Sequence, residues 1–436
     1  MIRLVTLAFA WLGFLNPTQS SELPIPLTDA DFNTYSAAQI KLGQLLFYDR
    51  ILSGSYRVSC ATCHNHDRGS SNGFLLPGAE KREGDTLATN GIDPYDATRP
   101  SSRHAPHLFN VGAKQITALF SDGRVAVADD GSYVSPAGDQ LPKGLQDILA
   151  VQALFPAVTG DELTGTVDSE IKAVAHLGNQ AIWGALAKRV QDVPEYWVYF
   201  KRAYPEMQSV KDIDITAISN ALGAFVGSEW RSTDSRFDRH LSGQKNVLSA
   251  REERGLNLFY GDAGCSTCHS GALLSDGQYH GVAAWPWRFD ANFSEELPDV
   301  LEGRITVTAK PSDAYRLRTP TLRNLSYSGP YGLAGGYNTL EGIIRAHVQP
   351  DVAHSNKLKV LDQSGIKWPD QAQMIFADML KKRSLKIPPL FLSSNEEKTE
   401  KAIGDLVAFL RSLDDEKGVR GQLGKPKEVP SSLALD

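Results

Sequence analysis

Cys60-Ala61-Thr62-Cys63-His64 is the stretch that decides the fold, and the same C-x-x-C-H pattern returns as Cys265-Ser266-Thr267-Cys268-His269. In such a segment the two thiols add to the vinyl groups of haem, and the histidine that follows becomes the proximal ligand of the iron. All four cysteines of the chain belong to these two pentapeptides. The sequence therefore predicts two covalently bound c-type haems, attached through Cys60, Cys63, Cys265 and Cys268, with His64 and His269 as iron ligands.

Two other uses of paired cysteines fit the pattern less well. Zinc ribbons place their two C-x-x-C knuckles within roughly 15 to 20 residues of each other, whereas Cys63 and Cys265 lie far apart in the sequence. A thioredoxin-like redox pair accounts for one motif but explains neither the duplicate nor the two trailing histidines. Both alternatives are weaker than haem attachment.

The length and composition are those of a globular protein with more than one core. A chain of 436 residues with 42% apolar and 22% charged residues can bury two or three cores. We expect one domain per haem, an N-terminal domain over residues 21–235 and a C-terminal domain over residues 236–436. The net charge of −6 argues against nucleic acid or an anionic membrane surface as a partner.

Residues 1–20 have the features of a secretory signal peptide. Arg3 precedes an apolar run from Leu4 to Leu15, and small residues near Ser20 offer a cleavage site. That run is too short to span a bilayer, and no later stretch approaches the roughly 20 apolar residues required, so we expect no membrane span in the mature protein. Covalent haem attachment to C-x-x-C-H takes place outside the bacterial cytoplasm, which predicts a periplasmic location.

The hydrophobic pattern predicts a mainly α-helical protein. Apolar residues recur at helical spacing in three segments, Ser36 to Tyr48, Val167 to Tyr204 and Ile215 to Val226. Capping-box pairs predict two further helices, one opened by Ser249 and Glu252 that leads into the second haem motif and a C-terminal one opened by Ser394 and Glu397. The order of a helix and then a haem motif thus occurs twice, and the polar stretch 231–248 is the expected crossing between domains.

Several further segments resemble the bacterial di-haem cytochrome c peroxidases and their relative MauG, and the resemblance covers nearly the whole mature chain. It implies two cytochrome c-like haem domains in tandem. In the first half it rests on Leu46-Phe47-Tyr48-Asp49, Leu52-Ser53-Gly54, Ser59 to His64, Ala105-Pro106 to Asn110-Val111, and Asp122-Gly123-Arg124. In the second half it rests on Arg254-Gly255-Leu256, Phe259-Tyr260-Gly261, Cys265 to His269, Arg318 to Asn324, Pro330-Tyr331, Gly335 and Thr339-Leu340-Glu341.

The resemblance implies a peroxidatic role for the haem held by His64. Gln152, Pro156 and Glu162 match a glutamine, a proline and a glutamate that stand over the open face of that haem in the family. Splitting the O–O bond of peroxide heterolytically requires a proton to leave one oxygen and reach the other, and a positioned carboxylate can perform both transfers. Glu162 is the candidate for that role. Without the resemblance, an acid in Gly160-Asp161-Glu162 is more simply a solvated surface group.

The second haem gains its distal ligand from His347, which stands where the peroxidases have a methionine and MauG a tyrosine. Methionine raises the potential of a haem, whereas two imidazole ligands generally leave it lower. The resemblance with this departure therefore implies an electron-transfer haem held by His269 and His347 that is easier to oxidise. The alternative for His347 is a hydrogen-bonded histidine on a helix face.

Three more departures bear on the mechanism. The histidine that caps the resting peroxidatic haem in many peroxidases has no counterpart in Gly78-Ala79-Glu80, which implies a permanently open first haem. Tryptophans that the family places near the haems are replaced by Ser121 and Ala263, which leaves Phe120, Phe259 or Tyr260 to line the gap. The family's calcium ion between domains is implied through Ser328 and Pro330, although His104 replaces an asparagine ligand.

These expectations combine into a periplasmic peroxidase-like oxidoreductase that reduces hydrogen peroxide with electrons relayed through the second haem. Its electron donor is expected to be a small cytochrome or cupredoxin. One alternative is a MauG-like enzyme that oxidatively modifies a side chain of a protein substrate. The other is a non-enzymatic di-haem electron carrier, in which both haems are six-coordinate.

Overall fold

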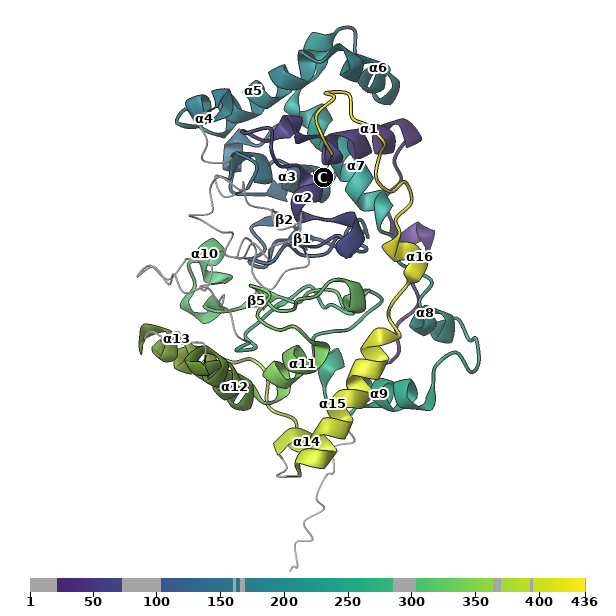
Figure 1. The fold of residues 1–436 in the computed structure, drawn as a ribbon, viewed down its shortest axis with the longest axis vertical. Helices are drawn as coiled ribbons and strands as arrows, with labels where there is room; N and C mark the ends of the chain where they lie inside the picture. Colours follow the sequence, from purple (N-terminus) through teal and green to yellow (C-terminus); the bar gives the residue numbers. More distant parts are fainter. Residues whose placement is uncertain are drawn as a thin grey trace, which may run out of the picture.

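The computed structural model describes residues 22–72, 103–159, 162–164, 169–284, 303–363, 370–392 and 395–435. The expected signal peptide and the position of the capping histidine at 78–80 lie outside these residues. Two helical halves stand one above the other along the long axis, the N-terminal half at the top of Figure 1 and the C-terminal half below it. The structure is mainly helical, as the sequence predicted.

Short strands and many helices make up the two halves. The N-terminal half contains α1 (Ala37–Tyr48), α2 (Cys60–Cys63), α3 (Ile148–Ala153), α4 (Glu170–Ala175), α5 (Asn179–Gln191), α6 (Pro194–Ala203) and α7 (Ile215–Glu229). The C-terminal half contains α8 (Arg236–Leu241), α9 (Ala250–Tyr260), α10 (Ile305–Thr308), α11 (Leu340–Val348), α12 (Pro350–Gln363), α13 (Asp370–Lys381), α14 (Pro389–Leu392), α15 (Glu396–Arg411) and α16 (Glu416–Val419). Antiparallel pairing joins β1 (Ala118–Leu119), β2 (Val125–Val127) and β3 (Tyr133–Val134) in one sheet and β4 (Tyr279–His280) with β5 (Leu317–Arg318) in another.

Side-chain caps fix where the helices that lead into the haem motifs begin. Ser36 caps α1 in a capping box with Gln39, and Ser249 caps α9 in the predicted box with Glu252. The start of the C-terminal helix differs by one position from the prediction, because Asn395 is the N-cap of α15 and accepts a hydrogen bond from the backbone N–H of Lys398.

The same close crossing of two helices occurs in each half. Helix α1 packs against α7, and α9 packs against α15. A Cβ added to Gly43 of α1 would lie 1.9 Å from the carbonyl oxygen of Ala221, and one added to Gly255 of α9 would lie 1.9 Å from that of Asp405. Only glycine allows the two backbones to approach so closely. The duplication expected from the haem motifs therefore extends to the scaffold.

A repeated asparagine ties the loop after each haem motif to the end of the crossing helix. The backbone N–H of Asn110 donates to Trp230 just after α7, and that of Asn324 donates to Leu413 just after α15. Both asparagines adopt a left-handed backbone with φ of 57°, a conformation that asparagine tolerates better than most residues. Each half thus closes its core in the same way.

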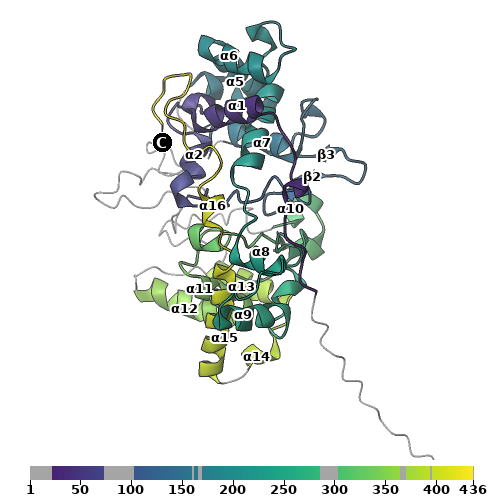
Figure 2. The same ribbon diagram turned by 90° about the vertical axis from the view of Figure 1, so that its right-hand side faces the viewer.

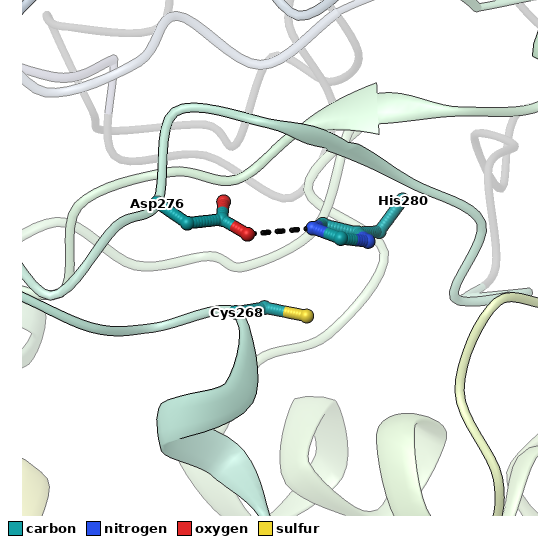
Figure 3. Close-up of side chains that lie close together, drawn as sticks. All are labelled: Cys268, Asp276 and His280. Atoms are coloured by element: carbon teal, nitrogen blue, oxygen red, sulfur yellow. Dashed lines mark hydrogen bonds and ion pairs between the residues drawn. The ribbon is translucent and has the colours of Figure 1, made fainter. Parts of the chain in front are cut away.

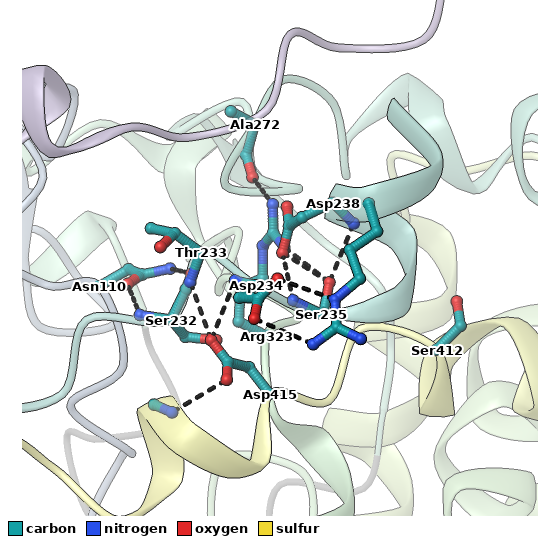
Figure 4. Close-up of polar contacts among 12 residues, drawn as sticks. Asn110, Ser232, Thr233, Asp234, Ser235, Asp238, Ala272, Arg323, Ser412 and Asp415 are labelled. Carbon is teal, nitrogen blue, oxygen red and sulfur yellow. Dashed lines mark hydrogen bonds and ion pairs between the residues drawn. The ribbon is translucent and has the colours of Figure 1, made fainter. Parts of the chain in front are cut away.

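The segment between the two halves is folded and packed against its surroundings. It contains α8, whose Asp238 forms an ion pair of 2.6 Å with Arg323, and both side chains are almost fully buried. Asp415 accepts hydrogen bonds of 3.0 Å from the backbone N–H groups of Thr233 and Asp234 (Figure 4). Some polar side chains of residues 231–248, a stretch that suggested a solvent-exposed linker between domains, are therefore buried and paired with other polar groups.

The C-terminal segment returns to the N-terminal half, where Figures 1 and 2 show it running beside α1 and α7. The amide of Gln44 donates to the carbonyl of Gly424 over 2.7 Å, and the Ser431 hydroxyl donates to Asp49 over 2.6 Å. Val429 is buried in the first core. Residues from both ends of the chain therefore stabilise the N-terminal core.

Candidate active site

The first haem motif is a single helical turn followed by its histidine. The backbone N–H of His64 donates to the carbonyl of Cys60 over 2.9 Å, which closes the turn. The Nδ1 atom of His64 lies 3.0 Å from the carbonyl oxygen of Ser70. A carbonyl accepts only from an N–H, so this contact selects the tautomer with a lone pair on Nε2, the nitrogen that an iron would take.

The second motif has the same geometry. The backbone N–H of His269 donates to Cys265 over 3.0 Å, and its Nδ1 lies 3.0 Å from the carbonyl oxygen of Leu274. Burial and, after it, the charge of His347 lower the pKa of His269 to about 4, against the opposing effects of the backbone of Leu274 and Pro320 and the charge of Asp276. Two imidazoles whose charges interact in this way lie close together.

His347 lies in α11, which follows the second motif in the sequence. Its Nδ1 lies 2.8 Å from the carbonyl oxygen of Ile343, one helical turn earlier, so its Nε2 also carries a lone pair. Arg383 donates to the carbonyl of His347 and holds the end of the helix. Burial is the main cause that lowers the pKa of His347. The structure thus brings His269 and His347 together as two neutral imidazoles, a donor set that fits a six-coordinate haem iron.

Gln152, Pro156 and Glu162 lie on one compact segment. Gln152 is in α3, the carbonyl of Pro156 accepts from the backbone N–H of Leu163 over 3.0 Å, and the N–H of Glu162 donates to Thr159 over 3.1 Å. These bonds fold the chain back so that Glu162 returns beside Pro156. The side chain of Glu162 is exposed.

The charge of Glu162 acts on Arg103. Burial lowers the pKa of Arg103, the positive charge of Arg124 lowers it further, and Asp122 and Glu162 oppose the shift. Arg103 also donates to the Ser121 hydroxyl over 3.2 Å. The carboxylate thus lies near the motif Asp122-Gly123-Arg124 at the side of the domain that faces the second half, where Arg318 donates to the carbonyl of Phe120 over 3.2 Å.

A cluster that the sequence did not point to lies beside the second motif. The Sγ of Cys268, a carboxylate oxygen of Asp276 and a ring nitrogen of His280 lie within 4.8 Å of one another, with 2.7 Å between Asp276 and His280 (Figure 3). Burial raises the pKa of Cys268 to about 11, so its thiol is uncharged at neutral pH. Because Cys268 belongs to a haem motif, we interpret the group as a hydrogen-bonded Asp276–His280 pair beside that motif rather than as a metal site.

The donor set around His104 does not fit a calcium ion. Its Nε2 lies 2.8 Å from the Ser71 hydroxyl, and its backbone N–H donates to Leu333 over 3.0 Å. Calcium prefers oxygen ligands, and an imidazole engaged with a hydroxyl offers none. Ser328 and Pro330 are buried, and we derive no step from calcium.

Phe120, Phe259 and Tyr260 take two kinds of position. The guanidinium of Arg124 lies 4.3 Å above the ring centre of Phe120 at the junction of the halves. Phe259 packs at 5.0 Å between ring centres against Phe409, inside the core of the second half, and Tyr260 is buried in the same core. Phe259 and Tyr260 therefore support the second core.

Comparisons with known proteins relate the chain to one family. Residues 37–246 match the family described as di-haem cytochrome c peroxidase. The chain is 26% identical over 385 residues to the methylamine utilization protein MauG of Methylorubrum extorquens, covering 88% of this chain and 80% of that protein. It is 28% identical over 316 residues to the cytochrome c551 peroxidase of Pseudomonas aeruginosa, covering 72% of each.

Two solved structures share the fold over nearly the whole chain. A MauG-like protein associated with microbial copper homeostasis superposes with a TM-score of 0.59 at 24% identity, covering 94% of this chain and 97% of that one. The di-haem peroxidase BthA from Burkholderia thailandensis superposes with a TM-score of 0.58 at 19% identity, covering 92% and 91%. Within the part of the chain that the structure describes, no helix is long and apolar enough to cross a membrane.

Proposed function

Because the chain belongs to the di-haem cytochrome c peroxidase and MauG family, an oxidoreductase family with two cytochrome c-like haem domains in tandem, we propose that it reduces hydrogen peroxide at the first haem with electrons relayed through the second. We place the N-terminal domain at residues 21–235 and the C-terminal domain at 236–436. We further propose a periplasmic location, with residues 1–20 as the signal peptide and a small cytochrome or cupredoxin as the electron donor.

The residues present fit two haems. Cys60 and Cys63 would carry the first and Cys265 and Cys268 the second, while His64 and His269 each offer an Nε2 lone pair. When bound, haem supplies one-electron redox chemistry and, where one coordination position is open, reaction with peroxide.

The interaction between His269 and His347 is the observation that carries the proposal. It closes the second site with two imidazoles. We propose that the first site, held by His64, stays open to peroxide, because a peroxidase with an internal electron relay needs one reactive haem and one haem that only transfers electrons.

In this proposal Glu162 moves the proton. Its carboxylate accepts the proton from one peroxide oxygen and delivers it to the other, which leaves as water, and the amide of Gln152 orients the substrate. Pro156, whose ring fixes the backbone before the turn, sets the position of Glu162 through the bond from Leu163. Arg103, whose charge interacts with Glu162, favours the ionised carboxylate that must accept the proton.

Replacing Glu162 by glutamine tests this role. We expect Glu162→Gln to slow the reaction with peroxide by roughly 10²- to 10⁴-fold while both haems remain attached. Glu195→Gln, a change of the same kind at an exposed position of α6, is the control and should react at the wild-type rate. A decrease of less than about threefold in Glu162→Gln would remove Glu162 from the mechanism.

The MauG-like alternative is favoured by two features of the sequence, the histidine in place of methionine at position 347 and the missing capping histidine at 78–80. It predicts oxidation of a side chain in a protein substrate and slow turnover with reduced cytochrome c. Steady reduction of peroxide by reduced cytochrome c would exclude it. The optical and EPR spectra of the isolated protein test both enzymatic proposals against a carrier, since either enzyme should show one high-spin and one low-spin haem.

A further inference from the structure

The segment at the end of α13 is strongly basic in a chain whose net charge is negative. From Met379 to Asn395 the sequence contains four basic residues and no acidic one, whereas the whole chain carries a net charge of −6. The four are Lys381, Lys382, Arg383 and Lys386. The three lysines are exposed and the arginine is half-buried. This basic segment, residues 381–386, therefore offers a local positive surface to a negatively charged molecule.

Two acids offset part of the charge of the basic segment. The Nζ of Lys382 lies 2.9 Å from the carboxylate of Asp378, one turn earlier in α13. Burial lowers the pKa of Arg383, and the charge of Asp351 in α12 opposes the shift. Within the described part of the chain, the remaining two lysines of the segment form no ion pair. The segment thus keeps a net positive charge with both acids counted.

One contact joins the basic segment to the helix that carries the proposed distal ligand of the second haem. The guanidinium of Arg383 donates a hydrogen bond to the backbone carbonyl of His347, near the end of α11. Arg383 is flanked in the sequence by the exposed Lys382 and Ser384. The positive surface is therefore separated from the proposed iron ligand by a single hydrogen bond.

Two further hydrogen bonds join the basic segment to the loop after the second haem motif. The backbone N–H of Ser384 donates to the carbonyl of Gly281 over 2.8 Å, and the N–H of Gly281 donates to the Ser384 hydroxyl over 3.0 Å. Gly281 directly follows His280, whose ring lies 2.7 Å from Asp276 beside Cys268 (Figure 3). The segment is thus fixed to the chain on both the proximal and the distal side of the second site.

We propose that the basic segment 381–386 is the docking surface for the electron donor, and that this donor is a small redox protein with an acidic face. The proposal rests on the proposed function in requiring that electrons enter at the second haem. Electron transfer slows steeply with distance, so a donor is used best where the protein surface is in direct contact with a ligand of the accepting iron.

Electrostatics favours an acidic partner at this place over any other part of the surface. Opposite charges steer two proteins into one orientation and raise their rate of association, whereas like charges suppress wrong orientations. The chain outside the segment is negatively charged overall, so it repels the partner that the segment attracts. In each encounter one electron passes from the reduced metal centre of the donor to the second haem, and no proton or bond is transferred.

The test uses the haem-loaded protein, reduced with dithionite, and oxidised plastocyanin, which is an acidic cupredoxin. Because two imidazole ligands leave a haem at a low potential, the electron passes downhill from the reduced protein to copper(II), through the same docked complex that serves a donor. Lys381→Glu/Lys386→Glu reverses the two lysines without an ion pair. Lys211→Glu/Lys245→Glu is the control, because it makes the same change in net charge at exposed lysines that precede α7 and α9. The connection from α8 to α9 lies on the opposite side of Figure 1 from α13.

The quantity measured is the bimolecular rate constant from stopped-flow absorbance of the low-spin haem. At an ionic strength of about 0.01 M, where the Debye length is about 30 Å, we expect Lys381→Glu/Lys386→Glu to react at least fivefold more slowly than the control variant. At about 1 M, where the Debye length is about 3 Å, the two variants should react at the same rate. Oxidation by uncharged benzoquinone should be equally fast in both variants.

Equal rates of the two variants with plastocyanin at low ionic strength would overturn the proposal. So would a matching decrease with benzoquinone, because the substitutions would then have altered the haem pocket and not the docking. Peroxide takes no part in this reaction. A failure of the wild-type protein to turn over peroxide would therefore refute the proposed function and leave the comparison of rates unchanged.

Discussion

Replacing Gly43 by alanine should separate the helices that carry the first haem domain. The added Cβ would lie 1.9 Å from the carbonyl oxygen of Ala221 and 2.7 Å from the Cβ of Phe225, which is too close for any real contact. The carbonyl belongs to the backbone of α7 and cannot rotate away, so the two helices must move apart by more than about 1 Å. Overpacking of this kind costs up to about 3 kcal/mol, and the higher helix propensity of alanine returns about 1 kcal/mol.

The net destabilisation of about 2 kcal/mol corresponds to a decrease in Tm of about 4 to 8 °C for a domain of this size. Urea and thermal unfolding followed by circular dichroism measure it, with haem absorbance reporting each attached haem. Gly184→Ala in α5 is the matched control, because nothing lies within 4 Å of the added Cβ, and it should stabilise the protein by up to about 1 kcal/mol. A Gly43→Ala protein as stable as wild type would refute the close crossing of α1 and α7.

Two further predictions concern buried charges. Asp238→Asn leaves Arg323 as an unpaired buried cation and should destabilise the protein by about 3 to 5 kcal/mol in urea unfolding, whereas Asp234→Asn at an exposed pair should have a much smaller effect. Burial lowers the pKa of Lys357 to about 8 from its usual 10.5, so between these values the unfolded chain binds more protons and folding stability rises with pH. The stability advantage of Lys357→Met over wild type should therefore shrink between pH 7 and pH 10, and a constant difference would contradict the shift.

The sequence predicted the elements whose signals are local. The helix before the first haem motif was visible from its apolar spacing, and the helix before the second from a capping pair followed by apolar residues; the structure confirms both, as α1 and α9. Helix α8 was missed because its segment is polar, and polarity indicates an exposed crossing only when the polar groups face water. Its own capping box, Ser235 with Asp238, was the available signal. The burial of Asp238 depends on Arg323, which no local pattern connects to it.

The residues of the candidate site were predictable only where they belong to a recognisable sequence motif. The meeting of His269 with His347 depends on how α11 packs, and counting from Thr339 suggested it only because the resemblance supplied the position.

Differences between the two halves are concentrated in the segments that the shared scaffold leaves variable. Both halves keep the haem motif, the close helix crossing and the left-handed asparagine. Between that asparagine and the end of the crossing helix, the first half inserts the segment that carries Gln152 and Glu162, and the second inserts α11 with His347. In the proposed function, one scaffold yields two unequal sites because each insertion supplies a different group, the acid Glu162 in one half and the imidazole of His347 in the other. Exchanging ligands within an insertion should therefore alter the chemistry of one haem without disturbing the attachment of either.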